Sequence, residues 1–227
     1  MKILALDSSG IVASVAVVED DTLLAEYTVN YKKTHSQTLL PMLDEIVKMT
    51  ELDLESVDAI AVAAGPGSFT GLRIGSATAK GLGLALKKPL VAVPTVDALA
   101  YNLYDAQGLV CPVMDARRKQ VYTGIYKFEN HQLVTVKEQW AAPMEELIEE
   151  LNERGETVIF LGDGVPVFRE MIQEKLKVPY SFAPAHLNKQ RAAAVAALGM
   201  IHYKEGRTET AEEHTPEYLR LSQAERE

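Results

Sequence analysis

The sequence contains a single cysteine, Cys111, and no run of about 18 apolar residues. These two absences exclude an internal disulfide, a zinc site built from several thiolates and a membrane-spanning helix. The first charges, at Lys2 and Asp7, come too early for a secretory signal peptide, so we expect a cytoplasmic protein. The hydrophobic share of 47% is ordinary for a globular chain, and 227 residues are enough for one large domain or two small lobes.

Positive charge is also scarce. The 23 Lys and Arg residues face 32 Asp and Glu residues, which gives a net charge of −9. Through Asp105 there are 8 basic and 13 acidic residues, and beyond it 15 and 19, so neither half has the basic surplus of a self-sufficient nucleic-acid binder. The small basic cluster Arg117, Arg118 and Lys119 is interpreted as a solvated turn, and direct nucleic-acid binding remains an alternative.

Apolar runs alternate with amphipathic segments along the chain. Three strands, a helix, a strand and a further helix follow one another, the order typical of a mixed-sheet α/β lobe. We place one lobe at 1–104 and a smaller one at 105–227, and whether the charged tail after Lys204 folds back on the first lobe stays open. The expected strands are 3–6, 12–18, 23–29, 59–64, 90–93, 109–114, 121–126 and 158–161, and the main expected helices are about 37–49, 70–86, 143–152, 165–176 and 191–203.

A glycine-rich loop, residues 65–75, joins an expected strand to an expected helix. Backbone N–H groups at such a junction can hold an anion, although a tight turn into the helix explains the glycines equally well. The loop lacks the Gly-Lys-Ser/Thr of a phosphate-binding P-loop, and its glycine spacing differs from the dinucleotide fingerprint. Ser68 lacks the flanking glycines of a nucleophile elbow.

Small residues recur every fourth position in the helix after this loop, at Gly71, Gly75, Ala79 and Gly83. Interior glycines each cost about 1 kcal/mol of helix stability relative to alanine, so close approach of another backbone is expected there. That backbone belongs either to the chain's own sheet or to a partner's helix. On the second interpretation, a bulky residue at Gly75 or Ala79 weakens the complex and leaves the fold nearly intact.

The first strand ends in a polar turn, Asp7, Ser8, Ser9 and Gly10. A carboxylate and two hydroxyls there could orient a phosphate or its magnesium ion, or Asp7 could simply cap the turn. Other reactive constellations are missing. The histidines include no pair spaced three or four apart, and Cys111 lies on an apolar strand where a core role is expected.

Several segments together resemble one family. They are Leu4–Ser9, His35–Pro41, the loop 65–75, Asp115–Arg118 with Val121–Tyr122, and Pro216–Arg220. On these the chain is similar, end to end, to the bacterial TsaB (YeaZ) family. The resemblance implies a two-lobed actin/Hsp70/sugar-kinase-like fold and a role in making threonylcarbamoyladenosine at position 37 of tRNA.

The resemblance also implies that the chemistry belongs to a paralogue, TsaD, which carries a metal-binding His-x-x-x-His motif. In this sequence the two histidines would fall at Thr95 and Leu99, which cannot replace imidazoles on a transition metal. We therefore expect a non-catalytic subunit that binds TsaD, works with the ATPase TsaE, reaches tRNA only through the complex and forms a homodimer when alone. No resident cofactor is expected, and a nucleotide at the partner interface is left open.

Within the family, TsaD is expected to dock on the helices of the first lobe, here about 37–49 and 70–86. The proposed interface residues are Leu39, Met42, Leu43, Ile46, Met49, Gly71, Ile74, Gly75, Thr78, Ala79, Leu82 and Gly83. Besides direct binding of tRNA, two enzymatic alternatives remain. One is a small-molecule kinase on the same fold, with Asp115 or Asp163 as the catalytic aspartate, and the other is a peptidase-like enzyme without a metal.

Overall fold

A computed structural model describes residues 1–31 and 34–219. The chain forms two compact units, the first made of Met1–Ala98 with the segment from Gln190 onward, and the second of Leu99–Lys189. The main elements before the chain enters the second unit are β1 (Lys2–Asp7), β2 (Val12–Glu19), β3 (Thr22–Asn30), α1 (Leu39–Thr50), β4 (Ala59–Gly65), α2 (Phe69–Leu86), β5 (Leu90–Pro94) and α3 (Thr95–Tyr101), which spans the boundary.

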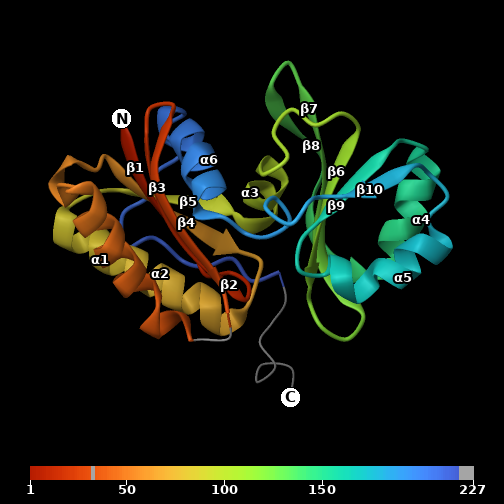
Figure 1. The fold of residues 1–227 in the computed structure, drawn as a ribbon, viewed down its shortest axis with the longest axis horizontal. Coiled ribbons are helices and arrows are strands. Elements are labelled where there is room, and N and C mark those ends of the chain that lie inside the picture. The colour runs from red at the N-terminus through yellow and green to blue at the C-terminus, as the bar shows by residue number, and fades with distance from the viewer. Residues whose placement is uncertain (32–33, 220–227) are drawn as a thin grey trace. The chain divides into compact units, whose positions relative to one another are not determined.

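The first unit is built on a five-stranded sheet in the order β3-β2-β1-β4-β5. β1, β2 and β3 pair antiparallel, whereas β4 and β5 run parallel to β1, because each of the latter follows a helical crossover. Helices α1 and α2 cover one face of this sheet, as Figure 1 shows. Their apolar sides and the sheet enclose a core that includes Leu4, Leu6 and Val15.

The second unit repeats the same order of elements. Its sheet runs β10-β9-β6-β7-β8, so β6 takes the central place that β1 takes in the first sheet. Helices α4 and α5 enclose its core. Its elements are β6 (Leu109–Asp115), β7 (Gln120–Glu129), β8 (Gln132–Pro143), α4 (Met144–Arg154), β9 (Val158–Leu161), α5 (Val165–Lys175) and β10 (Tyr180–Phe182), and the chain then continues into α6 (Ala192–Lys204).

The expected strands and helices are confirmed to within a few residues at each end, and two strands were missed. β8 is long and mixes polar with apolar residues, so its alternation is weak, and β10 has only three residues. The structure also divides the chain differently from the expected boundary at 104/105. The last helix, α6, follows the second sheet in sequence but packs on the first, against β1, β2, β4 and β5 (Figure 1).

Side chains of the first sheet explain why α6 belongs there, since they cap its N-terminus. The backbone N–H of Ala192 donates to Oγ of Ser14 at 2.8 Å, and that of Ala193 donates to Oε1 of Glu26 at 3.2 Å. The Glu26 carboxylate also forms an ion pair with Arg191. The first turn of a helix has unpaired N–H groups, and β2 and β3 supply the acceptors here.

Replacing Glu26 by alanine is expected to destabilise the protein by about 2 kcal/mol, because a hydrogen-bonded, partly buried charge pair and a helix cap are lost together. Urea unfolding measures the change. Glu19→Ala is the matched control, because its 3.5 Å contact with Lys2 lies at the surface and should contribute less than about 1 kcal/mol. Equal losses for both variants would contradict the capping role.

The segment after α6 also lies on the first unit. Glu209 pairs with Leu90 at the edge of β5 through two backbone hydrogen bonds, and the N–H of Glu217 donates to the carbonyl of Ala64 at 2.7 Å. Between these points Lys80 of α2 donates to the carbonyl of His214 at 2.9 Å. Residues 208–218, called the strap below, therefore follow α2 from its C-terminal end to its N-terminal end.

Candidate functional site

The polar turn at the end of β1 is closed and internally satisfied. Asp7, Ser8 and Ser9 are each no more than 2% exposed. Oδ1 of Asp7 accepts from the backbone N–H of Ser9 at 2.9 Å and from its hydroxyl at 2.7 Å. The Ser8 hydroxyl donates to the carbonyl of Gly71 at 2.8 Å, and His35 contacts the Gly10 carbonyl through Nε2 at 2.8 Å. This geometry is that of a capped turn, with both hydroxyls already engaged.

Burial makes Asp7 an unusual carboxyl group. Loss of hydration raises the pKa of Asp7 to about 6, and the two hydrogen bonds from Ser9 only partly oppose that change. A carboxyl whose pKa is raised on folding binds its proton more tightly in the folded state. It therefore adds stability that is complete below its unfolded pKa of 3.8 and is lost as the pH rises through about 6.

We expect Asp7→Asn to remove this pH dependence. Between pH 5 and 7 the free energy of unfolding of the wild type should fall by roughly 1 kcal/mol relative to the variant. Urea unfolding of both proteins at several pH values tests this. The free energy of unfolding of the variant is subtracted from that of the wild type at each pH, so that the contributions of groups common to both proteins, such as the histidines, cancel. Asp21→Asn, in an exposed turn, is the control and should track the wild type. If the difference in free energy of unfolding between the wild type and Asp7→Asn stays constant from pH 5 to 7, Asp7 is not a buried carboxyl group that takes up a proton in this range.

The glycine loop packs directly against that turn. Ser68 caps α2, with its side chain accepting from the N–H of Gly71 at 3.3 Å, and its own N–H donates to the Ser9 carbonyl at 2.7 Å. A Cβ on Gly67 would lie 2.3 Å from the Ser9 carbonyl oxygen, and one on Gly71 would lie 2.1 Å from that of Ser8. The loop glycines thus allow a helix start to touch the neighbouring strand end.

The small-residue ridge continues this contact along the sheet. A Cβ on Gly75 would meet the Ser8 hydroxyl oxygen at 2.5 Å, Ala79 is fully buried, and a Cβ on Gly83 would lie 2.9 Å from Leu90. The atoms that approach this ridge therefore belong to the chain itself: the Ser8 backbone at Gly71, and mainly side chains at Gly75 and Gly83. The expectation that a bulky residue at Gly75 or Ala79 leaves the fold nearly intact is wrong, because no space exists there.

Most of the interface residues proposed on α1 are also internal. Leu39, Met42, Leu43 and Ile46 belong to the core of the first unit, and each is at most 4% exposed. Met49 differs, being 82% exposed. On α2, three further proposed residues lie half-buried where the helix borders that core; they are Ile74, Thr78 and Leu82.

The exposed face of α2 carries a second ridge of small residues that the sequence reasoning missed. Ala77, Gly81 and Ala85 are exposed at period four, and a Cβ on Gly81 would meet nothing within 4 Å. Leu84, 57% exposed, lies beside them. These positions follow the buried ridge by two residues, or about 200° around the helix. The same spacing rule would have found them, but it gives no reason to prefer either ridge. We call these four residues the outer ridge.

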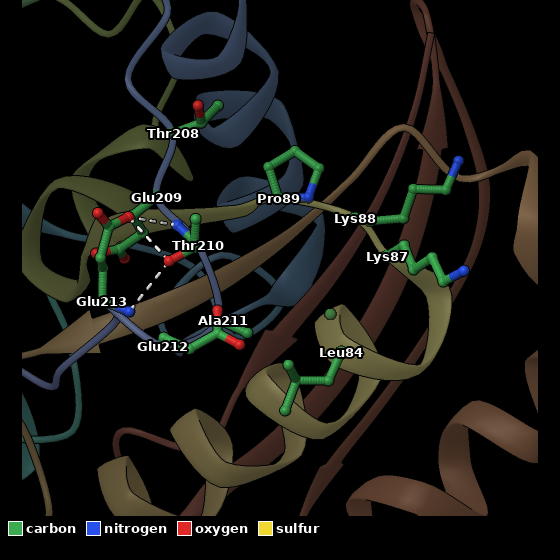
Figure 2. Close-up of a pocket in the computed structure, with 11 residues that line it drawn as sticks. Leu84, Lys87, Lys88, Pro89, Thr208, Glu209, Thr210, Ala211, Glu212 and Glu213 are labelled. Carbon is green, nitrogen blue, oxygen red and sulfur yellow. Dashed lines mark hydrogen bonds between the residues drawn. The ribbon is translucent and has the colours of Figure 1, made fainter.

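A surface cavity of about 400 Å³ adjoins the outer ridge. Figure 2 shows Leu84 and Lys87 at the C-terminal end of α2 on one side, and residues 208–213 of the strap on the other. Within the strap, the Thr210 hydroxyl and N–H both donate to Glu213 at 2.9 Å, which holds this wall in a fixed turn. The exposed face of α2 thus ends in a preformed hollow.

Other candidate groups are accounted for separately. Cys111 is fully buried, and burial raises the pKa of its thiol to about 12, so it is not an activated nucleophile. In the second unit, Oδ1 of Asp163 accepts from the N–H of Asp115 at 3.3 Å, and burial raises the pKa of Asp163. The Asp115 carboxylate accepts from Arg117 through that residue's N–H and Nη1.

No metal-binding constellation appears in residues 1–31 and 34–219, where no group of three or more His, Cys, Asp or Glu side chains comes together. Thr95 and Leu99, where the resemblance placed the two metal-binding histidines, are both buried, and Oγ1 of Thr95 accepts from the N–H of Gly65 at 3.1 Å. Over the same described residues, none of the helices is long and apolar enough to cross a membrane.

Comparison with known proteins agrees with the motifs. The family model of TsaD, tRNA N6-adenosine threonylcarbamoyltransferase, matches residues 22–227. The chain is 36% identical to the tRNA threonylcarbamoyladenosine biosynthesis protein TsaB of Bacillus subtilis (strain 168), over 99% of this chain and 96% of that protein. This chain belongs to the TsaB (YeaZ) family. A TsaB of Escherichia coli (strain K12) is 30% identical over 97% of this chain and 95% of its own.

Solved structures identify the fold. YeaZ from Pseudomonas aeruginosa superposes with a TM-score of 0.79 at 27% identity, covering 96% of this TsaB-family chain and 99% of its own. At the level of fold alone, an inorganic polyphosphate/ATP-glucomannokinase from an Arthrobacter strain reaches a TM-score of 0.50 at 15% identity, over 90% of this chain and 99% of its own. The fold is therefore the actin/Hsp70/sugar-kinase-like one that the resemblance implied.

Proposed function

We propose that this chain is a non-catalytic subunit of the cytoplasmic machinery that makes threonylcarbamoyladenosine in tRNA. In this role it binds and stabilises a catalytic TsaD-type relative and works with a TsaE-type ATPase. Family membership supports the pathway. The pairing itself depends on one observation, the outer ridge of α2.

The outer ridge suits close helix packing. Gly81 costs the helix about 1 kcal/mol relative to alanine, and outside its own stretch of helix no atom of residues 1–31 or 34–219 lies within 4 Å of a Cβ placed on it. Small side chains at Ala77, Gly81 and Ala85 let a second helix lie near the short end of the usual 8–10 Å interaxial range. Leu84 and Met49 add exposed apolar surface, the kind that marks protein interaction sites.

The interface proposed here therefore differs in its residues from the one expected on the buried ridge. The helices are the same, α1 and α2, but the contact residues are the outer ridge with Met49, next to the half-buried Ile74, Thr78 and Leu82. Because this chain matches the family model of TsaD, we expect a TsaD-type relative to offer a comparable helix pair. The same self-complementary surface supports a homodimer when the relative is absent.

Reconstitution tests the proposal. The purified chain, a TsaD-type relative and a TsaE-type ATPase are combined with unmodified tRNA, ATP and the threonylcarbamoyl precursors, and the modified nucleoside is measured. We expect product only when this chain is present, and no turnover by this chain alone. Modification at full rate without the chain, or turnover of ATP or peptide by the pure chain, would overturn the proposal in favour of an independent enzyme.

A further inference from the structure

The turn between β6 and β7 has an unusual backbone. Arg117, Arg118 and Lys119 all have positive φ, at 65°, 55° and 59°. The N–H of Gln120 donates to the carbonyl of Arg117 at 3.1 Å, so Arg118 and Lys119 occupy the two central positions of a tight hairpin turn of the type that needs left-handed residues. We call residues 117–119 the basic turn.

Other hairpins in the same chain meet this requirement in the usual way. The β7–β8 turn places Asn130 and His131 at φ of 50° and 63°, and the β2–β3 turn places Asp20 at 52°. Asn, Asp and His tolerate the left-handed region better than other residues with a side chain, and glycine tolerates it best. The basic turn has none of these types. Each of its residues carries a conformational penalty that a glycine or asparagine would reduce.

The fold gives the three side chains no compensating contacts of comparable worth. All three residues are exposed, and the Arg117 side chain is 82% exposed. Asp115 orients Arg117 through its N–H at 2.8 Å and Nη1 at 3.1 Å. Within the described part of the chain, the side chains of Arg118 and Lys119 form no hydrogen bond or ion pair. Three cations are thus presented to solvent, at a conformational cost, on a chain whose net charge is −9.

We propose that the basic turn contacts the phosphate backbone of the tRNA when the complex acts on it. This inference rests on the proposed function, which brings the chain to RNA, and it adds a direct contact to a role expected to be indirect. Guanidinium groups bind phosphate in a bidentate manner, and an ammonium group adds a point charge. A backbone with a phosphate at every nucleotide can accept several neighbouring cations, of which Arg117 is already oriented by Asp115, whereas an acidic protein surface needs matched carboxylates.

Affinity and its salt dependence test the contact. The complex of this chain with its TsaD-type relative is titrated with tRNA between about 50 and 200 mM salt. The triple variant R117A/R118A/K119A should form the complex normally, bind tRNA at least about tenfold more weakly and show a salt slope lowered by about 2 to 3. ATP and polyglutamate serve as the other two probes, and their affinities should not change.

A single glycine variant tests the link between strain and function. Arg118→Gly should raise the urea midpoint and also weaken tRNA binding, while Arg118→Lys should retain most of the binding. Asn130→Gly, in the β7–β8 turn, is the matched backbone control, and Lys177→Ala, an exposed cation elsewhere in the second unit, is the charge control. Both controls should leave tRNA affinity unchanged.

Several results would overturn the inference. If the intact triple-variant complex binds tRNA with unchanged affinity, the inference is wrong and the proposed function still stands. The same holds if only the affinity for ATP or for polyglutamate falls. A wild-type chain that never pairs with the relative defeats the proposed function instead. In that case the contact is tested by measuring how much of the chain alone is retained on immobilised tRNA at low salt. Equal retention of the wild type and the triple variant would show that the basic turn does not contact tRNA.

Discussion

Replacing Gly71 by alanine is expected to destabilise the protein by about 3 kcal/mol. The new Cβ would lie 2.1 Å from the Ser8 carbonyl oxygen, and backbone atoms cannot rotate away as a flexible side chain can. Helix α2 would have to move off β1, which breaks the bond from the Ser8 hydroxyl to the Gly71 carbonyl and opens the core beneath. The gain of about 1 kcal/mol in helix propensity is too small to offset this.

The same substitution ten residues later should have the opposite sign. A Cβ on Gly81 meets nothing within 4 Å, so Gly81→Ala gains the helix propensity without a clash and should stabilise the isolated chain by about 1 kcal/mol. Urea unfolding of the two variants gives the comparison. Similar stabilities for both would show that the assignment of buried and outer ridges is wrong.

A tryptophan at Gly81 is expected to weaken pairing with the TsaD-type relative by about a hundredfold, or roughly 3 kcal/mol, and to leave the isolated chain folded. The bulky ring would hold the two helices apart and remove the contacts of Ala77 and Leu84 as well, because these share the ridge. Calorimetry or surface-based binding measures the affinity, and the melting temperature of the chain alone reports the fold.

Glu170→Trp controls for a bulky aromatic side chain on an exposed helix, since Glu170 lies on the exposed face of α5 in the second unit. It should pair with the wild-type affinity. If Gly81→Trp also pairs normally, the partner docks elsewhere, and Met49 of α1 becomes the next position to change. If homodimer formation falls in parallel with pairing, the two assemblies use one surface.

Most of the helices and strands, and the family, could be predicted from the sequence, whereas β8 and β10 could not. Apolar periodicity located α1 to within about two residues at each end, because burial repeats at the helical period. The bounds predicted for α2, α5 and the alanine-rich α6 agree equally well. The glycine loop and the motif at Asp115 were specific enough together to indicate the family that the comparisons then showed.

Which face of a helix is buried depends on tertiary contacts and could not be predicted from the sequence. The ridge at Gly71 and the ridge at Gly81 have the same spacing. The first is buried because Ser8, 63 residues away from Gly71 in the chain, packs against it. In the same way α6 joins the first unit because Ser14 and Glu26, which lie 178 and 167 residues before the residues they bond, cap its N-terminus. The left-handed basic turn was equally hidden, since its residue types disfavour that backbone. A local sequence pattern can reveal that a residue is buried or strained only when the interaction responsible lies close by in the sequence. Here the helix faces are buried by contacts distant in the sequence, and the backbone of the basic turn is strained by the hairpin that it closes.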